Sequence, residues 1–326
     1  MSTSDIALSV QDLKVHFGGK KGILGGKSKT VHAVDGVSFE VPAGTTFGIV
    51  GESGSGKSTT ALAIMRLVHI TDGKITLRDT ALSDLDGEEL RDARSRFQIV
   101  FQDPYSSLNP RKRAGALVRE PLDLMGIGTP QERDQKVSEL FAQVGLRPEQ
   151  QALFPHQFSG GQRQRLGLAR ALSTRPELIV CDEPVSALDV AIQAQILNLM
   201  GDIQEELGLT YLFISHDLGV VQHICDTVAV MYLGQIVELA DRIKLFTNPR
   251  HPYTKALLGA VPSVRSNKQD GRTRVRLQGD PPSPINLPKG CRFASRCPIA
   301  EKRCEEAPPM LKKSADRHQV ACFLAD

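Results

Sequence analysis

The sequence contains no apolar run that approaches the roughly 18–20 residues of a membrane-spanning helix. Its start, MSTSDIALSV, also lacks the basic residues and apolar stretch of a secretory signal peptide. The charges nearly balance, since 40 Lys and Arg stand against 37 Asp and Glu, and this balance points to neither a nucleic-acid nor a membrane partner. We therefore expect a protein of the reducing cytoplasm, where six cysteines are more often reduced or metal-bound than joined in disulfides.

The composition is that of an ordinary globular protein. The chain has 326 residues, of which 40% are hydrophobic and 24% charged, and this length suits one large domain with an extension or two domains. Strand-like apolar runs alternate with helix-like stretches, which predicts an α/β core. The expected strands are TTFGIV at 45–50, ELIVCDE at 177–183 and TYLFIS at 210–215.

Two helices are predicted from apolar residues that recur on one helical face. The first follows Lys57, and its buried face is expected to hold Ala61, Ile64, Met65 and Val68. The second stops at Gly208, and its buried face is expected to hold Ile196, Leu199, Met200, Ile203 and Leu207. The segment 102–154 is expected to be mostly helical, and the proline-rich residues from Asn248 onward, which include four cysteines, indicate a separate extension.

A glycine-rich loop lies between the first predicted strand and the first predicted helix. Residues 51–58, GESGSGKS, fit the phosphate-binding pattern G-x-x-x-x-G-K-S/T. In this pattern backbone N–H groups and the helix dipole hold phosphate oxygens, the lysine reaches the outer phosphates and the last hydroxyl ligates Mg²⁺. We expect the nucleotide to be held by Gly51, Glu52, Ser53, Gly54, Ser55, Gly56, Lys57, Ser58 and Thr59, with Ser58 on the metal.

Polar residues stand where the other predicted strands end. Asp182 and Glu183 end one strand, and we expect the first to hold Mg²⁺ and the second to orient or deprotonate the attacking water. His216 ends the next strand and is expected to contact the γ-phosphate, although a lone histidine is more often structural. Gln102 follows an apolar run and could reach the metal or the water. The alternative for the carboxylates is a solvated pair at a strand end.

A second glycine pair opens a predicted helix at HQFSGGQRQR. Ser159 and Gln162 have the spacing of a helix capping box, so an ordinary helix start is one interpretation. A cap needs no paired glycines, however, and Gly160 and Gly161 expose backbone N–H groups that could bind an anion. Because the first loop already encloses one nucleotide, we expect this second site to serve a nucleotide held by another subunit. Two chains, head to tail, would sandwich two ATP molecules.

These motifs, in this order and with SALD at 186–189, resemble the ATP-binding cassette (ABC) ATPases over roughly residues 5–245. The resemblance implies an α/β, RecA-like P-loop NTPase fold with a helical subdomain at about 103–170. It places Gln102 in the Q-loop, Ser159 to Gln162 in the signature, Asp182 in Walker B and Glu183 as the catalytic base. Asp189 then lies in the D-loop, His216 is the switch histidine, and Phe17 stacks on adenine unless it is a core residue.

Further motifs resemble the F-type ATPase subunit of dipeptide and oligopeptide importers, notably FQDPYSSLNPR and NPRHPYTKALLGAVP. The resemblance implies a peripheral protein on the cytoplasmic face of the membrane, docked through the region 102–109 on two permease subunits. It also implies a second ATPase subunit, identical or paralogous, and an extracytoplasmic binding protein that acts indirectly. On this interpretation residues 1–247 form the nucleotide-binding domain and 248–326 the small cysteine-bearing extension.

Four cysteines in the extension, Cys291, Cys297, Cys304 and Cys322, are crowded enough to share a metal. Their spacing matches no compact zinc ribbon and no C-x₂-C ferredoxin run, so four unrelated thiols remain the alternative. In the resembling subfamily some extensions bind a 4Fe–4S cluster, which is favoured here over Zn²⁺, while His318 is the less favoured ligand. Cys181 and Cys225 are expected to be core or free thiols.

Two other function classes stay open. One is an ABC ATPase that acts on nucleic acid or ribosomes without a permease, and the other is a metal-cluster redox protein with a nucleotide switch. Among importers, related systems carry peptides, nickel, opines or sugars, so the motifs do not identify the transported molecule.

Overall fold

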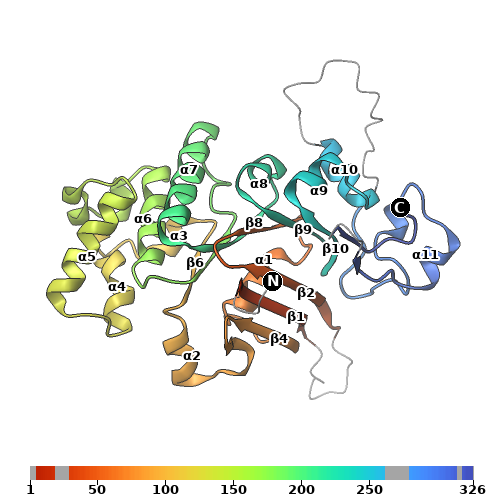
Figure 1. Cartoon of the computed structure of the whole chain (residues 1–326), viewed down its shortest axis with the longest axis horizontal. Helices are drawn as coiled ribbons and strands as arrows, with labels where there is room; N and C mark the ends of the chain where they lie inside the picture. Colours follow the sequence, from red (N-terminus) through yellow and green to blue (C-terminus); the bar gives the residue numbers. More distant parts are fainter. Residues whose placement is uncertain (1–4, 19–28, 261–278, 314–317, 326) are drawn as a thin grey trace. The chain divides into compact units, whose positions relative to one another are not determined.

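The computed structural model describes residues 5–18, 29–260, 279–313 and 318–325, which form two compact units (Figure 1). Unit 1 draws on the described residues within 1–9, 40–46 and 75–214, and unit 2 on those within 10–39, 47–74 and 215–326. The chain therefore passes between the units several times. Three strands contribute at least three residues to each unit: β1 (Ile6–Phe17), β2 (Val31–Pro42) and β4 (Asp72–Leu77).

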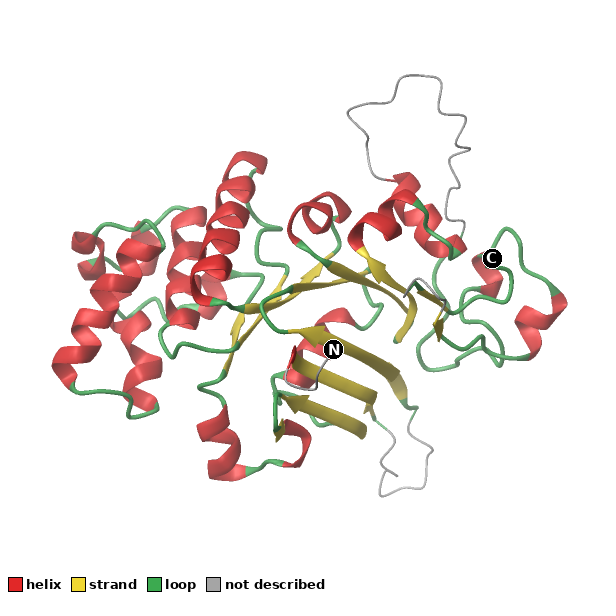
Figure 2. Ribbon diagram, in the orientation of Figure 1, coloured by secondary structure: helices red, strands yellow, loops and turns green. Residues whose placement is uncertain are grey.

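Unit 1 combines three parallel strands with a group of helices (Figure 2). β7 is the middle strand, since Leu178 pairs with Phe97 on one side and with Thr210 on the other. The strands of this unit, besides the shared ones, are β5 (Thr80–Ala81), β6 (Phe97–Val100), β7 (Leu178–Asp182) and β8 (Thr210–Ser215). Its helices are α2 (Gly87–Ala93), α3 (Pro104–Ser107), α4 (Ala114–Leu124), α5 (Pro130–Gln143), α6 (Gly160–Leu172) and α7 (Val190–Leu207).

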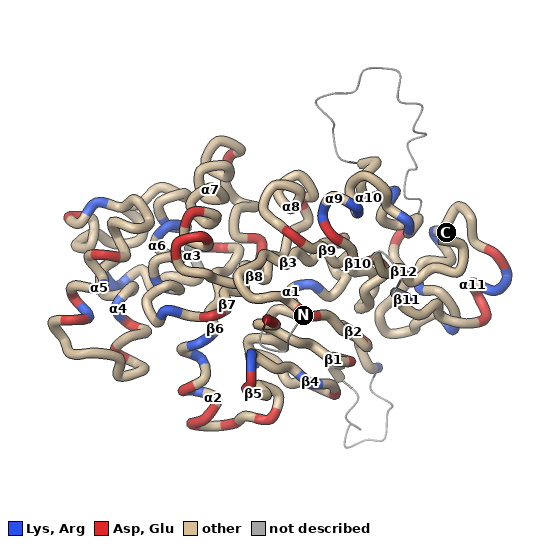
Figure 3. The backbone as a smooth tube through the Cα atoms, in the orientation of Figure 1, with Lys and Arg blue, Asp and Glu red and all other residues tan. Residues whose placement is uncertain are grey.

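Helix α6 organises the helical part of unit 1, because it packs against α3, α4, α5, α7 and β6. The predicted helical character of 102–154 is confirmed by α3, α4 and α5. Basic and acidic residues are mixed along α4 and α5 (Figure 3), where Arg119 and Arg133 both form ion pairs with Asp123. Ion pairs therefore link the exposed faces of these helices, whereas apolar side chains pack on their buried faces.

Helix α7 ends as the sequence predicts, because Gly208 adopts the left-handed conformation with φ 66°. Its buried face holds Ile196, Met200 and Ile203 as expected. The expectation for Leu207 was wrong, since this side chain is 47% exposed. Leu207 lies in the last turn of α7, beyond the buried part of the helix.

Unit 2 contains a parallel pair of strands that continues into antiparallel ones. β3 (Thr46–Val50) is parallel to β9 (Thr227–Tyr232), and β9 pairs with β10 (Gln235–Asp241) in an antiparallel hairpin. The next strands are β12 (Gln319–Val320) and β11 (Lys312–Lys313). The helices are α1 (Lys57–Ile64), α8 (Leu218–Ile224), α9 (Arg242–Thr247), α10 (Pro252–Ala260) and α11 (Lys302–Glu306). Short 3₁₀ turns complete the two units at 82–84, 148–152, 155–157 and 294–296.

Every residue of β3 is buried, which confirms the first predicted strand. The helix that follows is shorter than predicted. α1 ends at Ile64, and Arg66 takes a left-handed conformation with φ 52°, so Val68 lies outside the helix. A buried helix of two turns thus replaces the longer amphipathic one that the apolar spacing indicated.

The last residues of the chain are held to β10 by a buried carboxylate. Glu238 is fully buried and accepts hydrogen bonds from His318 Nε2 at 2.6 Å and from the backbone N–H groups of Arg250 and His251 at 2.7 and 3.0 Å. Burial alone would raise the pKa of Glu238, but these hydrogen bonds hold it below its ordinary value. His318 therefore has a structural partner, in agreement with its low rank as a metal ligand.

Among the described residues, no helix is both long and apolar enough to cross a bilayer.

Candidate active site

The loop 51–58 joins β3 to α1 in unit 2 and curls as the phosphate-binding pattern requires. Gly51 and Gly56 have φ values of 154° and 104°. A Cβ atom at Gly51 would lie 2.2 Å from the carbonyl oxygen of Met231, and one at Gly56 would lie 2.4 Å from that of Ala33. No larger residue fits either position, so this backbone path depends on glycine.

Lys57 is nearly buried, and its ammonium group lies inside the loop. Nζ donates to the carbonyl oxygens of Gly51 and Glu52, both at 2.9 Å. The hydroxyl of Ser55 is buried and has no hydrogen-bond partner among the described residues. A cation and an unsatisfied hydroxyl at the start of a helix fit a polyphosphate, because both groups can donate hydrogen bonds to phosphate oxygens.

Glu52 is held by two residues of the C-terminal part of unit 2. Its backbone N–H donates to Tyr253 Oη at 2.9 Å. Its carboxylate accepts two hydrogen bonds from Arg296, at 2.7 Å from Nη1 and 3.1 Å from Nη2. Neither partner was predicted from the sequence, since they lie about 200 and 240 residues further along the chain.

The carboxylates predicted for catalysis lie at the end of β7 in unit 1. β7 ends at Asp182, and Glu183 leaves the strand in the left-handed conformation with φ 48°. Its N–H donates to Ile214 of β8 at 2.9 Å, and its carbonyl oxygen accepts from Ser186 Oγ at 3.0 Å. The backbone turn at Glu183 therefore sets this residue apart from Asp182, the last residue of the strand.

Gln102 lies beside Glu183, as the predicted catalytic set requires. Gln102 follows β6, and its amide Nε2 donates to Glu183 Oε2 at 3.1 Å. An amide donor fixes the direction of the carboxylate without a charge. One side of the Glu183 carboxylate is therefore oriented by Gln102.

Ser159 and Gln162 form the predicted capping box at the start of α6. The Gln162 N–H donates to Ser159 Oγ at 3.3 Å, and the Ser159 N–H donates to Gln162 Oε1 at 2.9 Å. The glycines between them also have a packing role. A Cβ atom at Gly161 would lie 2.5 Å from Ile192, and one at Gly160 would lie 3.2 Å from Leu188. The glycine pair thus allows the start of α6 to approach the segment that leads into α7.

Three further predicted site residues, two in unit 2 and one in unit 1, are on the surface. Phe17 ends β1 and is 43% exposed, so the alternative that it belongs to the core is excluded. His216 is exposed directly after β8, between Ser215 and the N-cap of α8. Asp189, in unit 1, caps α7 through a hydrogen bond from the Ile192 N–H at 3.0 Å. Each of these positions is compatible with contact to a ligand.

The four cysteines of the extension line one cavity in unit 2. Cys291, Cys297, Cys304 and Cys322 share it with apolar residues, including Phe293. Burial raises the pKa of the Cys291 and Cys297 thiols, and the neighbouring cysteines add to this. Cys181 and Cys225 are buried elsewhere, which confirms them as core thiols. Four thiols therefore lie around one small and mostly apolar space.

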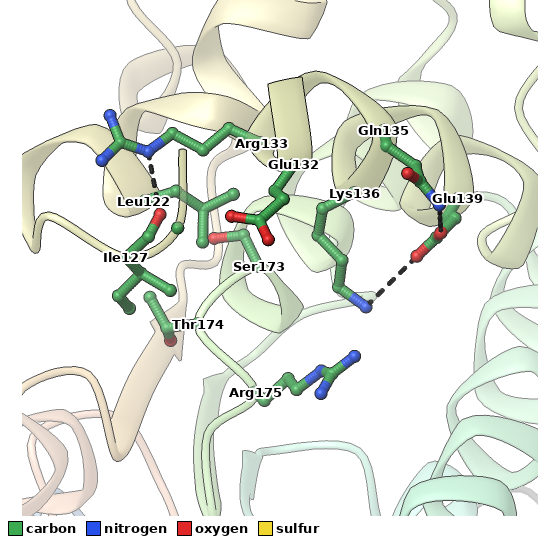
Figure 4. Close-up of a pocket in the computed structure, with 11 residues that line it drawn as sticks. Leu122, Ile127, Glu132, Arg133, Gln135, Lys136, Glu139, Ser173, Thr174 and Arg175 are labelled. Carbon is green, nitrogen blue, oxygen red and sulfur yellow. Dashed lines mark hydrogen bonds and ion pairs between the residues drawn. The ribbon is translucent and has the colours of Figure 1, made fainter. Parts of the chain in front are cut away.

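A separate hollow of about 380 Å³ lies in the helical part of unit 1 (Figure 4). Glu132 and Lys136 of α5 line it together with Arg175, which follows α6. The hollow includes none of the residues predicted to bind or hydrolyse a nucleotide. It therefore does not compete with the loop 51–58 as the candidate site.

Sequence comparisons place the chain beside ATP-binding subunits of transporters. Residues 34–186 match the family model "ABC transporter", and residues 237–304 match "Oligopeptide/dipeptide transporter, C-terminal region". The oligopeptide transport ATP-binding protein AppF of Bacillus subtilis is 51% identical, over 99% of this chain and 98% of its own. The dipeptide transport ATP-binding protein DppF of Haemophilus influenzae is 47% identical, over 98% of this chain and 97% of its own.

Solved structures agree with the predicted fold class. CbiO1 of Clostridium perfringens, part of an ABC transporter complex, has a TM-score of 0.65 and 25% identity, and the match covers 75% of this chain and 92% of that one. The ATP-binding cassette MJ0796, in a dimeric state bound to ADP and phosphate, has a TM-score of 0.63 and 28% identity, and the match covers 72% and 98%. The α/β P-loop NTPase fold is thereby confirmed.

Proposed function

Because the chain belongs to the ABC transporter family of ATPases and carries that family's oligopeptide/dipeptide C-terminal region, we infer that it powers the import of dipeptides or oligopeptides. The observation that carries this inference is the match along nearly the whole chain to peptide-transport ATP-binding proteins, extension included. The motif geometry adds the chemical basis. A curled phosphate loop and an oriented carboxylate are the parts that ATP hydrolysis needs.

The residues divide the work as follows. The N–H groups of 53–59 and the Lys57 ammonium bind the phosphates, with Phe17 against the adenine ring. Ser58 and Asp182 would hold Mg²⁺, which would neutralise negative charge on the phosphates when bound. Glu183, oriented by Gln102, accepts a proton from the attacking water, and His216 contacts the γ-phosphate.

Two ATPase subunits, identical or paralogous, complete each site. Ser159, Gly160, Gly161 and Gln162 of one subunit bind the γ-phosphate of the nucleotide on the other, and Asp189 lies at the same interface. The dimeric state of the related cassette MJ0796, with ADP and phosphate, supports this arrangement. ATP binding closes the dimer and hydrolysis reopens it.

The chain docks, on the cytoplasmic face of the membrane, on two membrane-spanning permease subunits, to which an extracytoplasmic binding protein delivers the peptide. The docking region is 102–109. Tyr105 in α3 is 63% exposed, and the Arg163 guanidinium stacks over its ring 3.5 Å from the centroid. An exposed aromatic ring whose orientation is fixed by a stacked guanidinium is a suitable contact for a partner helix.

Peptide uptake tests the proposed function. Cells that lack this gene are expected to lose uptake of a labelled dipeptide or oligopeptide. The wild-type gene restores uptake and the Lys57→Ala variant does not, because the phosphate-binding ammonium is absent. If these cells kept peptide uptake but lost the uptake of another solute, that solute would be the transported substrate instead. Co-purification with ribosomes or nucleic acid, and not with a permease, would favour the alternative of a non-transport ATPase.

For the extension, we propose that Cys291, Cys297, Cys304 and Cys322 ligate a structural 4Fe–4S cluster, with Zn²⁺ as the alternative. Their shared cavity supports a common metal centre, and its small size and apolar lining suit a group that is enclosed by protein. The cluster supplies a rigid four-way crosslink when bound. The thiols themselves contribute four anionic ligands once metal binding displaces their protons to solvent.

Metal analysis of anaerobically purified protein tests the cysteine site. We expect about four iron atoms and four sulfides per chain, with broad visible absorption, because four thiolates are the usual ligands of this cluster. Cys304→Ser should lose both, whereas the matched control Cys225→Ser, at a core thiol, should retain them. One zinc and no iron would establish the alternative, and the absence of any metal would contradict both.

A further inference from the structure

Glu52, the second residue of the phosphate loop, has each of its polar groups engaged. Its carbonyl oxygen accepts from Lys57 Nζ at 2.9 Å and from the Ser55 N–H at 3.2 Å. Its N–H donates to Tyr253 Oη, and its carboxylate is bound by Arg296. The loop on one side and the C-terminal region on the other therefore meet at one residue.

Arg296 is placed for this contact with little freedom to move. Its side chain is 5% exposed, whereas the Glu52 side chain is 29% exposed. The two N–H···O bonds have the parallel fork geometry that makes an arginine–carboxylate pair both strong and directional. Nη1 also lies 3.4 Å from Tyr232 Oη, and the hydrogen bonds to Glu52 raise the pKa of Arg296 above its ordinary value.

Tyr253 belongs to a packed aromatic group. Its ring centroid lies 4.7 Å from that of Tyr232 and 5.4 Å from that of Phe293. All three rings are at most 1% exposed. The hydroxyl that receives the Glu52 N–H is thus fixed by its own core, which includes a residue of the cysteine-bearing segment.

We propose that Arg296 and Tyr253 are positioning residues that hold the phosphate loop ready for nucleotide, and that they act through Glu52. The proposal rests on the function inferred above, because it concerns the same ATP-binding loop. Neither residue needs to touch ATP. The C-terminal segment therefore helps to position the nucleotide-binding loop in unit 2.

The expected effect is on nucleotide affinity more than on turnover. A loop that is already in its binding shape loses little conformational entropy when the phosphates arrive. Without Arg296, the Glu52 carboxylate keeps its negative charge close to the loop that must receive a polyanion, and Glu52 loses the two hydrogen bonds that fix its side chain. Once ATP is bound, the phosphates themselves hold the loop, so the chemical step is less affected.

A mutant cycle on the full-length chain tests the proposal. Arg296→Met and Glu52→Gln should each weaken MgATP binding about tenfold, while kcat changes less than about threefold. The double variant should be no weaker than the weaker single one, because both changes remove the same interaction. Tyr253→Phe should weaken binding in the same direction. Binding is measured with a fluorescent ATP analogue, and KM and kcat by phosphate release.

Arg303→Met is the matched control. It makes the same substitution in the same segment, at an exposed arginine whose ion pair is with Glu301 at 3.0 Å. It should bind MgATP like the wild type. Arg296→Lys, which keeps the charge but loses the fork, should retain part of the affinity, and together with Tyr253→Phe it serves as the test if Arg296→Met does not fold.

Wild-type affinity in folded Arg296 and Glu52 variants would overturn the proposal, as would equal losses in Arg303→Met or additive losses in the double variant. Failure of the proposed function would look different. In that case the wild-type chain itself would neither bind nor hydrolyse MgATP.

Discussion

Replacement of Glu183 by glutamine is expected to lower ATP turnover by about 10²–10⁴-fold while MgATP still binds, because the amide cannot accept the proton of the attacking water. The phosphate loop is untouched by the change. The dimer should then remain closed around ATP, since hydrolysis no longer reopens it. Phosphate release in the steady state, nucleotide affinity and the size of the protein with MgATP are the measurements.

The control is Glu205→Gln, the same substitution at an exposed position of α7. It should hydrolyse ATP at the wild-type rate. Glu183 adopts a left-handed backbone that Gln tolerates no worse than Glu, so the variant should also unfold at the wild-type urea concentration. A Glu183→Gln protein with near wild-type turnover would remove this residue from the role of general base.

Replacement of Ser159 by arginine is expected to abolish hydrolysis but to leave the nucleotide affinity of the isolated chain nearly intact. Ser159 opens α6 in unit 1, and its proposed ligand is the nucleotide of the other subunit. A bulky cation at that helix start blocks the close approach of a second subunit to the γ-phosphate. ATPase rate and affinity are measured on the same preparation, the latter at a protein concentration where the chain is monomeric.

Loss of the helix cap is the competing explanation, and the chain offers a matched control for it. Thr129 and Glu132 form the same capping box at the start of α5, with hydrogen bonds of 3.3 and 2.7 Å. Thr129→Arg should cost a similar stability, typically about 1 kcal/mol, and retain hydrolysis. Equal loss of activity in both variants, or loss of monomer affinity in Ser159→Arg, would contradict a site shared between subunits.

The motifs that depend on neighbouring residues could be predicted from the sequence. The strand before the loop 51–58, the capping box at Ser159 and the glycine stop at Gly208 all occur as expected. In each case the physical requirement is local: a backbone angle, a hydrogen bond across three residues or a run of buried side chains. The burial of Cys181 follows in the same way from its place in an apolar strand.

Features that depend on long-range contacts could not be predicted. The left-handed turn at Glu183 is fixed by Ile214 on a neighbouring strand, and the clamp on Glu52 by Tyr253 and Arg296. Nothing in the residues around 52 indicates these partners. Arg296 stands directly before Cys297 in the sequence, but which residue it binds depends on how the extension packs against β9 and β10. The early end of α1 and the exposure of Leu207 were likewise not predicted.

The interleaved path of the chain has a consequence for its synthesis on the ribosome. β3, which leads into the phosphate loop, takes β9 as its parallel neighbour, with Phe47 opposite Thr227, and residues 75–214 emerge between them. A polypeptide released early therefore displays the loop motif on a strand with an open edge, without Tyr253 or Arg296 behind Glu52. We expect such a fragment to be prone to aggregation through that open edge and to bind MgATP more weakly than the full chain. The phosphate loop therefore gains both partners of Glu52 only after translation has passed Arg296.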